Sequence, residues 1–315
     1  MKRTSIGGQA VMEGIMMKNG DQYAVCVRKP NQEIVIKKDE YQSVTQKYPI
    51  LNMPILRGVC NFGESLYVGM KTLTFSAEFL EEEAGQEEAG RVEKALQKIL
   101  GEKMDDILMG FTMCLSVVLA VAIFMILPFF LSELLKNYIP SHMVRTLIEG
   151  VFRVSIFLLY VVAISRMSEI KRVFMYHGAE HKTINCLESG DPLTPENVMK
   201  HSRLHKRCGT SFLLIVMIIS IIVFMFIRVD TLWLRFLSRI LLVPVVAGIS
   251  YEFLRLAGRN NSALVNFLSK PGLCLQYLTT KEPDVSMIEV AIASVESIFD
   301  WEAYQEAMRN GEIED

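Results

Sequence analysis

This sequence lacks paired cysteines, a secretory leader and a strong excess of charge of either sign. Its six cysteines are scattered and never form a C-x-x-C pair: Cys26, Cys60, Cys114, Cys186, Cys208 and Cys274. Because the N-terminus also lacks a signal-peptide pattern, we expect reduced thiols in the cytosol or the membrane and no disulfide framework. The formal net charge is only −2. This value argues against nucleic acid as a partner, since domains that bind nucleic acid are usually strongly basic.

Apolar residues, in contrast, are abundant. They make up 51% of the chain, and the mean hydropathy is +0.29, yet 22% of the residues are charged. An ordinary soluble protein is less apolar, and a protein buried wholly in lipid is less charged. The composition is therefore typical of a membrane protein with a substantial soluble part.

Four apolar segments are candidates for membrane spans. Residues 107–132 and 209–227 contain no charged residue and are long enough to cross a bilayer. The uncharged runs at 154–165 and 240–251 are shorter, a length that by itself favours a buried or re-entrant helix. Arginines precede both short runs, and their aliphatic stems can extend to a membrane interface. We therefore expect about four transmembrane helices.

The fold class expected is mixed: an α-helical membrane protein with a small N-terminal cytosolic α/β region. The stretches YAVCVRKP and EIVIKK alternate like strands around a Pro30-Asn31 turn. Lysine and arginine are concentrated before the first span, between the second and third, and after the last. The positive-inside rule therefore predicts a multi-pass cell-membrane protein with both termini in the cytosol. The expected divisions are a soluble α/β region (1–75), a charged linker with an amphipathic helix (76–106), a first transmembrane hairpin (107–165), a cytosolic loop rich in histidine and cysteine (166–208), a second hairpin (209–257) and a cytosolic helical tail (258–315).

Four of the five histidines fall in the central loop, in two pairs with the same spacing. These pairs are His177/His181 and His201/His205, and Cys208 follows three residues after the second pair. Residues i and i+4 share one face of a helix, which lets two imidazoles bind one ion. A basic loop rich in histidine can instead bind anionic lipid headgroups or a neighbouring domain.

The first pair belongs to the pattern H-x-x-E-H, with Glu180 beside His181. In inverted zinc hydrolases the two histidines bind zinc, and the glutamate accepts a proton from water on the metal. A distant glutamate normally completes the ligand set, and Glu252 lies at the expected cytosolic end of the last span. The pattern predicts a divalent metal, with zinc preferred, and Glu180 as the catalytic base. Glu252 has the alternative of pairing with Arg255, because charges at the end of a span are often anchors.

The N-terminal region contains a second group of polar residues among apolar ones. Glu13 lies in the stretch IGGQAVMEGIMMKNG, which matches neither a P-loop nor a dinucleotide fingerprint, so a turn is the favoured interpretation. Arg57, at the expected start of a helix, is a candidate catalytic residue that orients an anionic substrate. The alternative is an ion pair between Arg57 and Glu13 or Glu64.

Five separated stretches together resemble the bacterial membrane family called domain of unknown function 1385. They are GGQAVMEGIMM, PILRG, YHGAEHKTINC, HKRCGTSF and YEFLR. The resemblance covers nearly the whole chain from Gly7 to about residue 300, and it implies a metal-dependent membrane protein without a known substrate. The family's motif residues correspond here to His177, Glu180, His181, His205 and Cys208, with Glu13, Arg57 and Glu252 in the flanking motifs. His201 lies outside these motifs.

The sequence favours a membrane-embedded, metal-dependent enzyme, a hydrolase whose site lies at the cytosolic membrane face. A site at that depth suits a membrane lipid or a membrane-protein segment as substrate. The alternative is a non-catalytic scaffold or regulator, in which the His/Cys cluster binds a structural metal or docks a partner. A transporter or channel is least favoured, because the two long apolar segments contain no ionisable residue. The sequence leaves the oligomeric state open.

Overall fold

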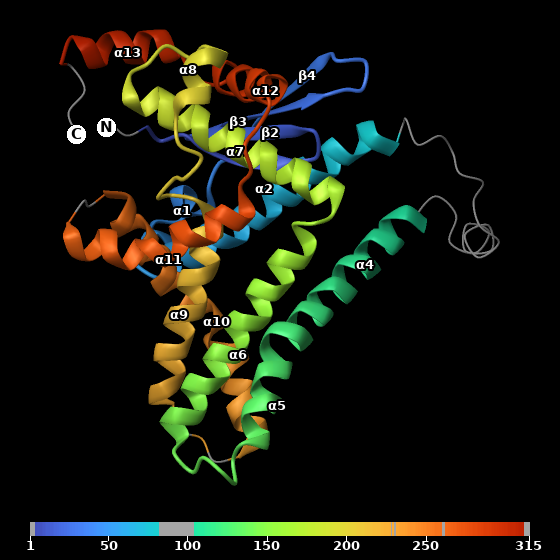
Figure 1. The fold of residues 1–315 in the computed structure, drawn as a ribbon, viewed down its shortest axis with the longest axis vertical. Coiled ribbons are helices and arrows are strands. Elements are labelled where there is room, and N and C mark those ends of the chain that lie inside the picture. The colour runs from blue at the N-terminus through green and yellow to red at the C-terminus, as the bar shows by residue number, and fades with distance from the viewer. Residues whose placement is uncertain (1–3, 82–103, 228, 230, 260–261, 312–315) are drawn as a thin grey trace.

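The computed structural model describes residues 4–81, 104–227, 229, 231–259 and 262–311. Most of the charged linker expected at 76–106 lies outside these residues. The described chain forms two layers: a sheet covered by helices lies at one end of a bundle of long helices (Figure 1). The candidate site residues lie mainly in the first layer and at the junction between the two.

A four-stranded antiparallel sheet forms the N-terminal region, with the strands in sequence order. The structure contains the hairpin expected around Pro30-Asn31, and it adds two strands in the glycine-rich stretch before it. Glu13 has a positive φ of 49° in the tight turn between these first two strands. The strands are β1 (Gly7–Val11), β2 (Gly14–Asn19), β3 (Gln22–Arg28) and β4 (Ile34–Glu40).

Helices cover both faces of this sheet. Residues alternate along β2, so that Ile15 and Met17 pack against α7 and α12, whereas Met16 packs in the cluster that contains residues of α2. The C-terminal segment forms two helices, of which α12 is part of the buried core and α13 begins after the N-cap Asp300. The helices of this layer are α2 (Leu56–Glu81), α7 (Ser168–Ser189), α12 (Val285–Glu296) and α13 (Trp301–Arg309), with short helices α1 (Val44–Lys47), η1 (Pro49–Asn52) and α8 (Pro195–Lys200).

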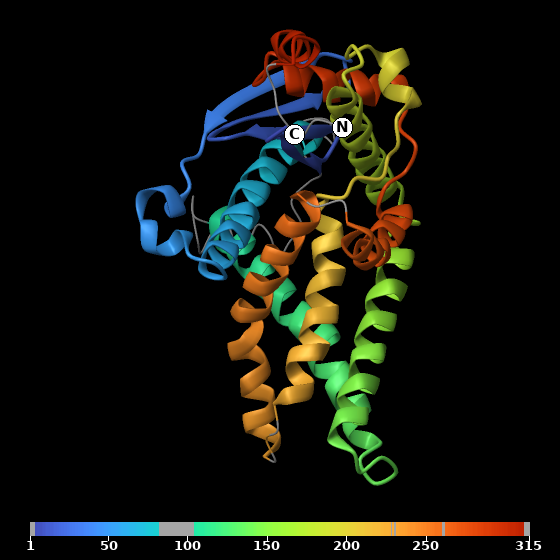
Figure 2. The same ribbon diagram turned by 90° about the vertical axis from the view of Figure 1, so that its left-hand side faces the viewer.

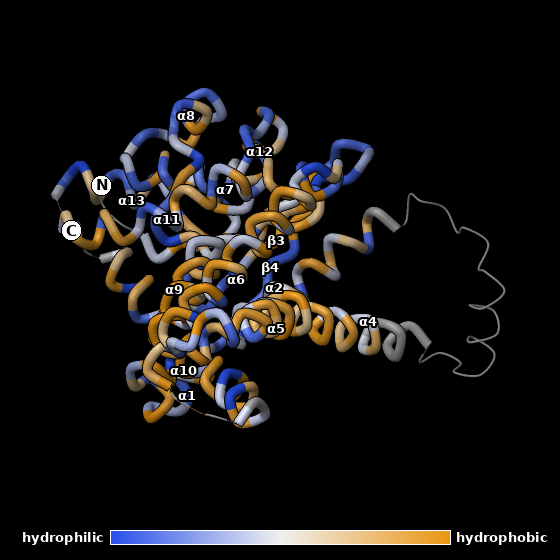
Figure 3. Tube along the Cα trace, turned by 60° about the horizontal axis from the view of Figure 1, so that its bottom comes forward, coloured by the Kyte–Doolittle hydropathy of each residue, from blue (hydrophilic) through white to orange (hydrophobic). Residues whose placement is uncertain are grey.

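Among the described residues, the second layer contains four helices that are long and apolar enough to cross a membrane: Gly110–Leu134, His142–Ile164, Gly209–Phe226 and Trp233–Gly258. Apolar residues predominate along this bundle, whereas polar residues gather around α8 and α13 (Figure 3). The first of the four is continuous through a π-helical turn. The corresponding elements are α4 (Met104–Val121), η3 (Ala122–Ile126), α5 (Leu127–Leu134), α6 (His142–Ile164), α9 (Gly209–Phe226) and α10 (Leu232–Arg259).

A buried ionic cluster explains why two of the uncharged runs are short. Arg153 on α6 donates to Glu149 of the same helix at 2.8 Å and to Ser220 on α9 at 2.9 Å. Arg239 on α10 also pairs with Glu149. The runs at 154–165 and 240–251 are therefore parts of longer helices whose charges are buried against their neighbours.

Helix α11 (Ala263–Thr279) lies at the junction between the two layers (Figures 1 and 2). It packs closely against α9, because a Cβ at Gly272 would lie only 2.8 Å from the Ser211 side chain. Gln276, which is fully buried, accepts from the backbone N–H of His205 and donates to the carbonyl of His205. Helix α11 therefore fixes the segment that leads into Cys208.

Candidate metal centre

Helix α7 positions the H-x-x-E-H residues on one face. His177, Glu180 and His181 are three and four residues apart, and the helix from Tyr176 to Glu188 is almost entirely buried. The sheet, α12 and residues 201–208 surround it. The segment 166–208, expected as a loop, is therefore centred on a buried helix.

His177 faces Cys208. Its Nδ1–H donates to the backbone carbonyl of Thr279 at 2.9 Å, which leaves the lone pair on Nε2. Nε2 lies 3.1 Å from the Sγ of Cys208. Cys208 is the N-cap of α9, and its Sγ accepts from the backbone N–H of Thr210 at 3.4 Å.

His181 is oriented in the same way. Its Nδ1–H donates to the backbone carbonyl of Arg203 at 2.6 Å, so its Nε2 is also free to bind a metal. One ligand atom each from His177, His181 and Cys208 lie within 4.8 Å of one another. Neighbouring ligand atoms around tetrahedral zinc lie about 3.3–3.6 Å apart, given bonds of about 2.0–2.3 Å. Two imidazoles, each held by a carbonyl on its other nitrogen, and one thiol are a donor set that zinc accepts, and their limit of 4.8 Å is wider than the spacing around a bound ion.

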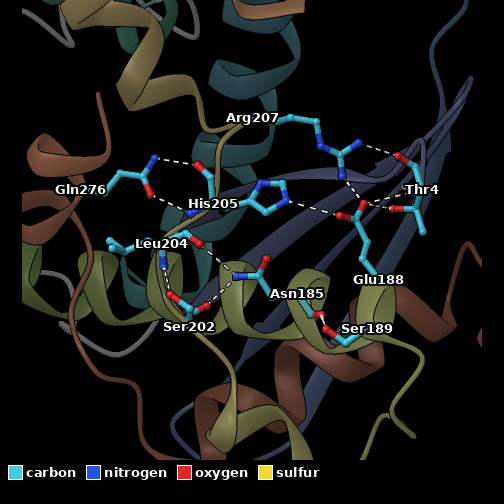
Figure 4. A network of polar contacts seen from close by, with 9 residues as sticks. All are labelled: Thr4, Asn185, Glu188, Ser189, Ser202, Leu204, His205, Arg207 and Gln276. Carbon is cyan, nitrogen blue, oxygen red and sulfur yellow. Dashed lines mark hydrogen bonds and ion pairs between the residues drawn. The ribbon is translucent and has the colours of Figure 1, made fainter. Parts of the chain in front are cut away.

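His205 lies beside this group, with its ring centroid 5.7 Å from that of His181, but it is not one of the three residues whose ligand atoms converge. Its Nε2 lies 3.7 Å from an oxygen of Glu188, which also pairs with Arg207 (Figure 4). The backbone N–H of Thr4 donates to the same carboxylate at 2.9 Å. Burial favours a higher pKa for Glu188, but the contact with His205 and the charge of Arg207 outweigh it and hold that pKa below its usual value. Burial lowers the pKa of His205.

Glu180 is buried against the first strand. Only 5% of its surface is exposed, and burial raises the pKa of its carboxyl group, while the electrostatic influence of His177 and the backbone N–H of Gly8 act in the opposite direction. A Cβ at Gly8 would lie 2.9 Å from the Cγ of Glu180. The glycine in the N-terminal motif therefore allows the carboxyl group of Glu180 to lie against the sheet.

The other two predicted site residues bind each other. Arg57, at the start of α2, donates from Nε to Glu252 on α10 at 2.6 Å, and a second contact makes the pair bidentate. Neither belongs to the group of His177, His181 and Cys208. This ion pair links the first layer to the bundle.

The remaining polar residues also have structural partners. Glu13 accepts two bonds from Arg172 at 2.5 Å, and His201 lies 2.9 Å from Asp191. The two carbonyls that orient the imidazoles, those of Thr279 and Arg203, carry no signal in the sequence because any residue type supplies a carbonyl. Gly178, in contrast, is visible in the sequence as a glycine inside the H-x-x-E-H stretch. It leaves room for the backbone, since a Cβ there would lie 2.0 Å from the carbonyl oxygen of Lys281.

The residues of this centre lie within a stretch that matches a known family. Residues 53–301 match the family described as protein of unknown function (DUF1385). The chain belongs to this family. A DUF1385-like relative is the uncharacterized protein YqhQ of Bacillus subtilis (strain 168), which is 37% identical over 305 residues, covering 95% of this chain and 94% of the relative. No solved structure matches. Membership of DUF1385 confirms the resemblance seen in the five motifs, and the family itself has no established function.

Proposed function

We propose that this protein is a membrane-embedded, metal-dependent hydrolase with its site at the cytosolic membrane face. The observation that carries the proposal is the convergence of His177, His181 and Cys208, with each imidazole donating from Nδ1 to a carbonyl so that Nε2 is the nitrogen left to bind a metal. Three protein ligands leave one position open on a tetrahedral ion, which is typical of catalytic zinc sites. A divalent ion held there, with zinc preferred, supplies Lewis acidity that activates water.

Glu180 is the proposed general base. It lies next to His181 and one helical turn from His177, it is buried, and it occupies the position of the base in the H-x-x-E-H pattern. The hydrogen bond from the Gly8 N–H and the neighbouring Met17 side chain restrict its position. Arg57 is bound to Glu252 and therefore contributes to this proposal only by positioning α2 against α10.

The proposed location follows from the four apolar helices and the distribution of basic residues. Cys208 directly precedes α9, one of the four helices that are long enough to cross a membrane. If these helices span the bilayer with both termini in the cytosol, the metal centre lies at the inner membrane surface. That depth favours a membrane lipid or a membrane-protein segment as the substrate.

The alternative is a scaffold or regulator with a closed, structural metal site. Such a site needs a fourth protein ligand, for which His205 was the sequence-based candidate. The contact of His205 with Glu188 favours the open, catalytic arrangement.

Elemental analysis of the purified full-length protein tests the proposal. We expect near-stoichiometric zinc in the wild type, loss of zinc in His181→Ala, and retention of zinc in Glu180→Gln and His205→Gln. Loss of zinc in His205→Gln, with the fold intact, would indicate a closed four-ligand site and favour the structural role. An absence of metal in the wild type even after supplementation would refute the enzyme proposal.

A further inference from the structure

An apolar stripe runs the length of α11 and ends beside the metal centre. Its residues recur at alternating spacings of four and three, which places them on one face of the helix: Leu264, Leu268, Pro271, Leu275 and Leu278. Near the start of the helix this face is open, since Leu264 is 67% exposed and its neighbour Phe267 is 64% exposed. A helix with its polar contacts on one side and such a face on the other is typical of one that lies in a membrane interface.

Towards its C-terminal end, the same stripe forms one wall of a groove. The groove has a volume of about 430 Å³, and apolar side chains of α6 and α9 form its other walls. Its lining residues are Val154, Leu158, Leu214, Ile218, Pro271, Cys274, Leu275 and Leu278. All eight are uncharged, and the helices α6 and α9 are two of the four that can cross a membrane.

One end of the groove lies next to the residues that contact His177 and Cys208. Leu278 is followed by Thr279, whose carbonyl accepts from His177 Nδ1–H. On the opposite wall, Leu214 lies one helical turn after Thr210, whose hydroxyl is 3.1 Å from the Sγ of Cys208 and 3.3 Å from the hydroxyl of Thr279. The groove thus lies on the bundle side of these polar contacts.

We propose that this groove binds one acyl chain of a membrane lipid and presents the polar end of that lipid to the metal centre. An acyl chain is the occupant that matches three observations: a predominantly apolar lining, a position among helices that can span a bilayer, and an open apolar face on α11 that continues into the groove. The presentation of the polar end to the metal centre rests on the proposed function, because it identifies the substrate class as an acyl lipid. The binding of the acyl chain in the groove does not depend on the metal.

A photoreactive lipid tests the site in the full-length protein. The protein is reconstituted in vesicles of phosphatidylcholine with phosphatidylglycerol that carries a diazirine in one acyl chain, then solubilised in mild detergent, purified and irradiated. Lipid that only surrounds the bundle is diluted away by the detergent. We expect the remaining crosslinks in peptides that contain Leu214, Cys274 and Leu278.

Two variants of α11 provide a matched comparison. Cys274 and Tyr277 are both exposed on this helix, but only Cys274 lines the groove. We expect Cys274→Trp to fill the groove and reduce crosslinking about tenfold, which corresponds to about 1.4 kcal/mol of binding free energy. Tyr277→Trp should crosslink like the wild type. Equal crosslinking in the two variants, or crosslinks spread evenly over the outer faces of the bundle, would overturn the proposal.

The outcome is separate from that of the metal experiment. Groove crosslinks in a protein without metal would refute the proposed hydrolase and leave the lipid site intact. Normal zinc content without groove crosslinks would refute the acyl-chain site and leave the hydrolase in place. A third outcome is that no crosslinks form in the groove and that maleimide labels Cys274 less as the protein concentration rises. This result would assign the groove to contact with a second copy of the chain and would refute the lipid proposal.

Discussion

Replacing Gly178 by alanine is expected to weaken metal binding although the added methyl group does not touch the ion. The glycine lies in the H-x-x-E-H stretch, where the backbone after α11 crosses α7. A Cβ at this position would be 2.0 Å from the carbonyl oxygen of Lys281, whereas ordinary contact begins at 3.4 Å. The crossing segment would have to move by roughly 1.4 Å, the difference between these two distances.

This movement affects the carbonyl that orients His177. Thr279, two residues before Lys281, accepts from His177 Nδ1–H at 2.9 Å, and a hydrogen bond of this kind weakens beyond about 3.2 Å. Loss of the partner that orients a metal-binding histidine typically costs about 10–100-fold in metal affinity. Crowding in a packed interior costs about 1–3 kcal/mol of stability. We expect Gly178→Ala to show both effects.

Competition with a chromophoric chelator measures the zinc affinity, and thermal unfolding measures the stability. Gly63→Ala is the matched control, because Gly63 also lies inside a helix but a Cβ there has no atom within 4 Å. The control should bind zinc normally and gain about 0.5–1 kcal/mol, since alanine favours a helix over glycine. If Gly178→Ala binds zinc as tightly as the control does, the link between Thr279 and His177 does not govern metal binding and this reasoning is wrong.

Three further predictions concern the buried polar groups. Glu149→Gln leaves two buried arginines without their carboxylate and should cost about 3–5 kcal/mol of stability in detergent, whereas Glu169→Gln on an exposed helix start should change little. Stability of the metal-free protein should fall as the pH drops below 6.5: burial lowers the pKa of His205, so the unfolded chain binds the proton first. In His205→Gln this pH dependence is lost, so its free energy of unfolding should fall less than that of the wild type between pH 7 and pH 5. An equal fall in the two proteins would contradict the prediction. Gln276→Leu removes the bonds to the backbone of His205 and should cost about 1–3 kcal/mol, measured by thermal unfolding, with zinc affinity also reduced.

Local periodicity made part of this site predictable from the sequence. The spacing of His177 and His181 places both on one helical face whatever the helix packs against, and the structure brings them together with Cys208. The choice among His205, Cys208 and Glu252 as a third ligand depends on how α9, α10 and α11 pack, and no spacing along the chain contains that information. Glu252 is bound to Arg57, a partner on a helix almost two hundred residues earlier in the chain.

The same distinction applies to the fold. Alternation identified the β3–β4 hairpin, but the strands β1 and β2 contain glycines that resemble a loop pattern. These glycines allow close contacts with residues that are distant in the sequence. A Cβ at Gly14 would lie 2.3 Å from the Cys26 carbonyl, and one at Gly8 would contact Glu180. Charges obscured two of the four apolar helices for a related reason. A hydropathy average treats the charges of Glu149 and Arg153 as the end of an apolar segment, although in the folded chain the two side chains are buried and form an ion pair with each other.

Three residues outside the candidate ligand set hold its parts in place, and at one of them, Gly8, the glycine-rich motif already indicated a close backbone approach. Gly8 holds Glu180 against the sheet, Gly178 admits the segment that carries Thr279, and Gln276 ties α11 to the segment before Cys208. Each of these residues supplies space or a backbone contact, and none of them brings chemistry of its own. If the four apolar helices span a membrane and this group binds a metal, as proposed, the bundle sets the depth of the group and the layer that contains the sheet sets its orientation. A substitution that disturbs only the junction between the layers should change metal affinity and lipid access together, and one on the outer faces of either layer should change neither.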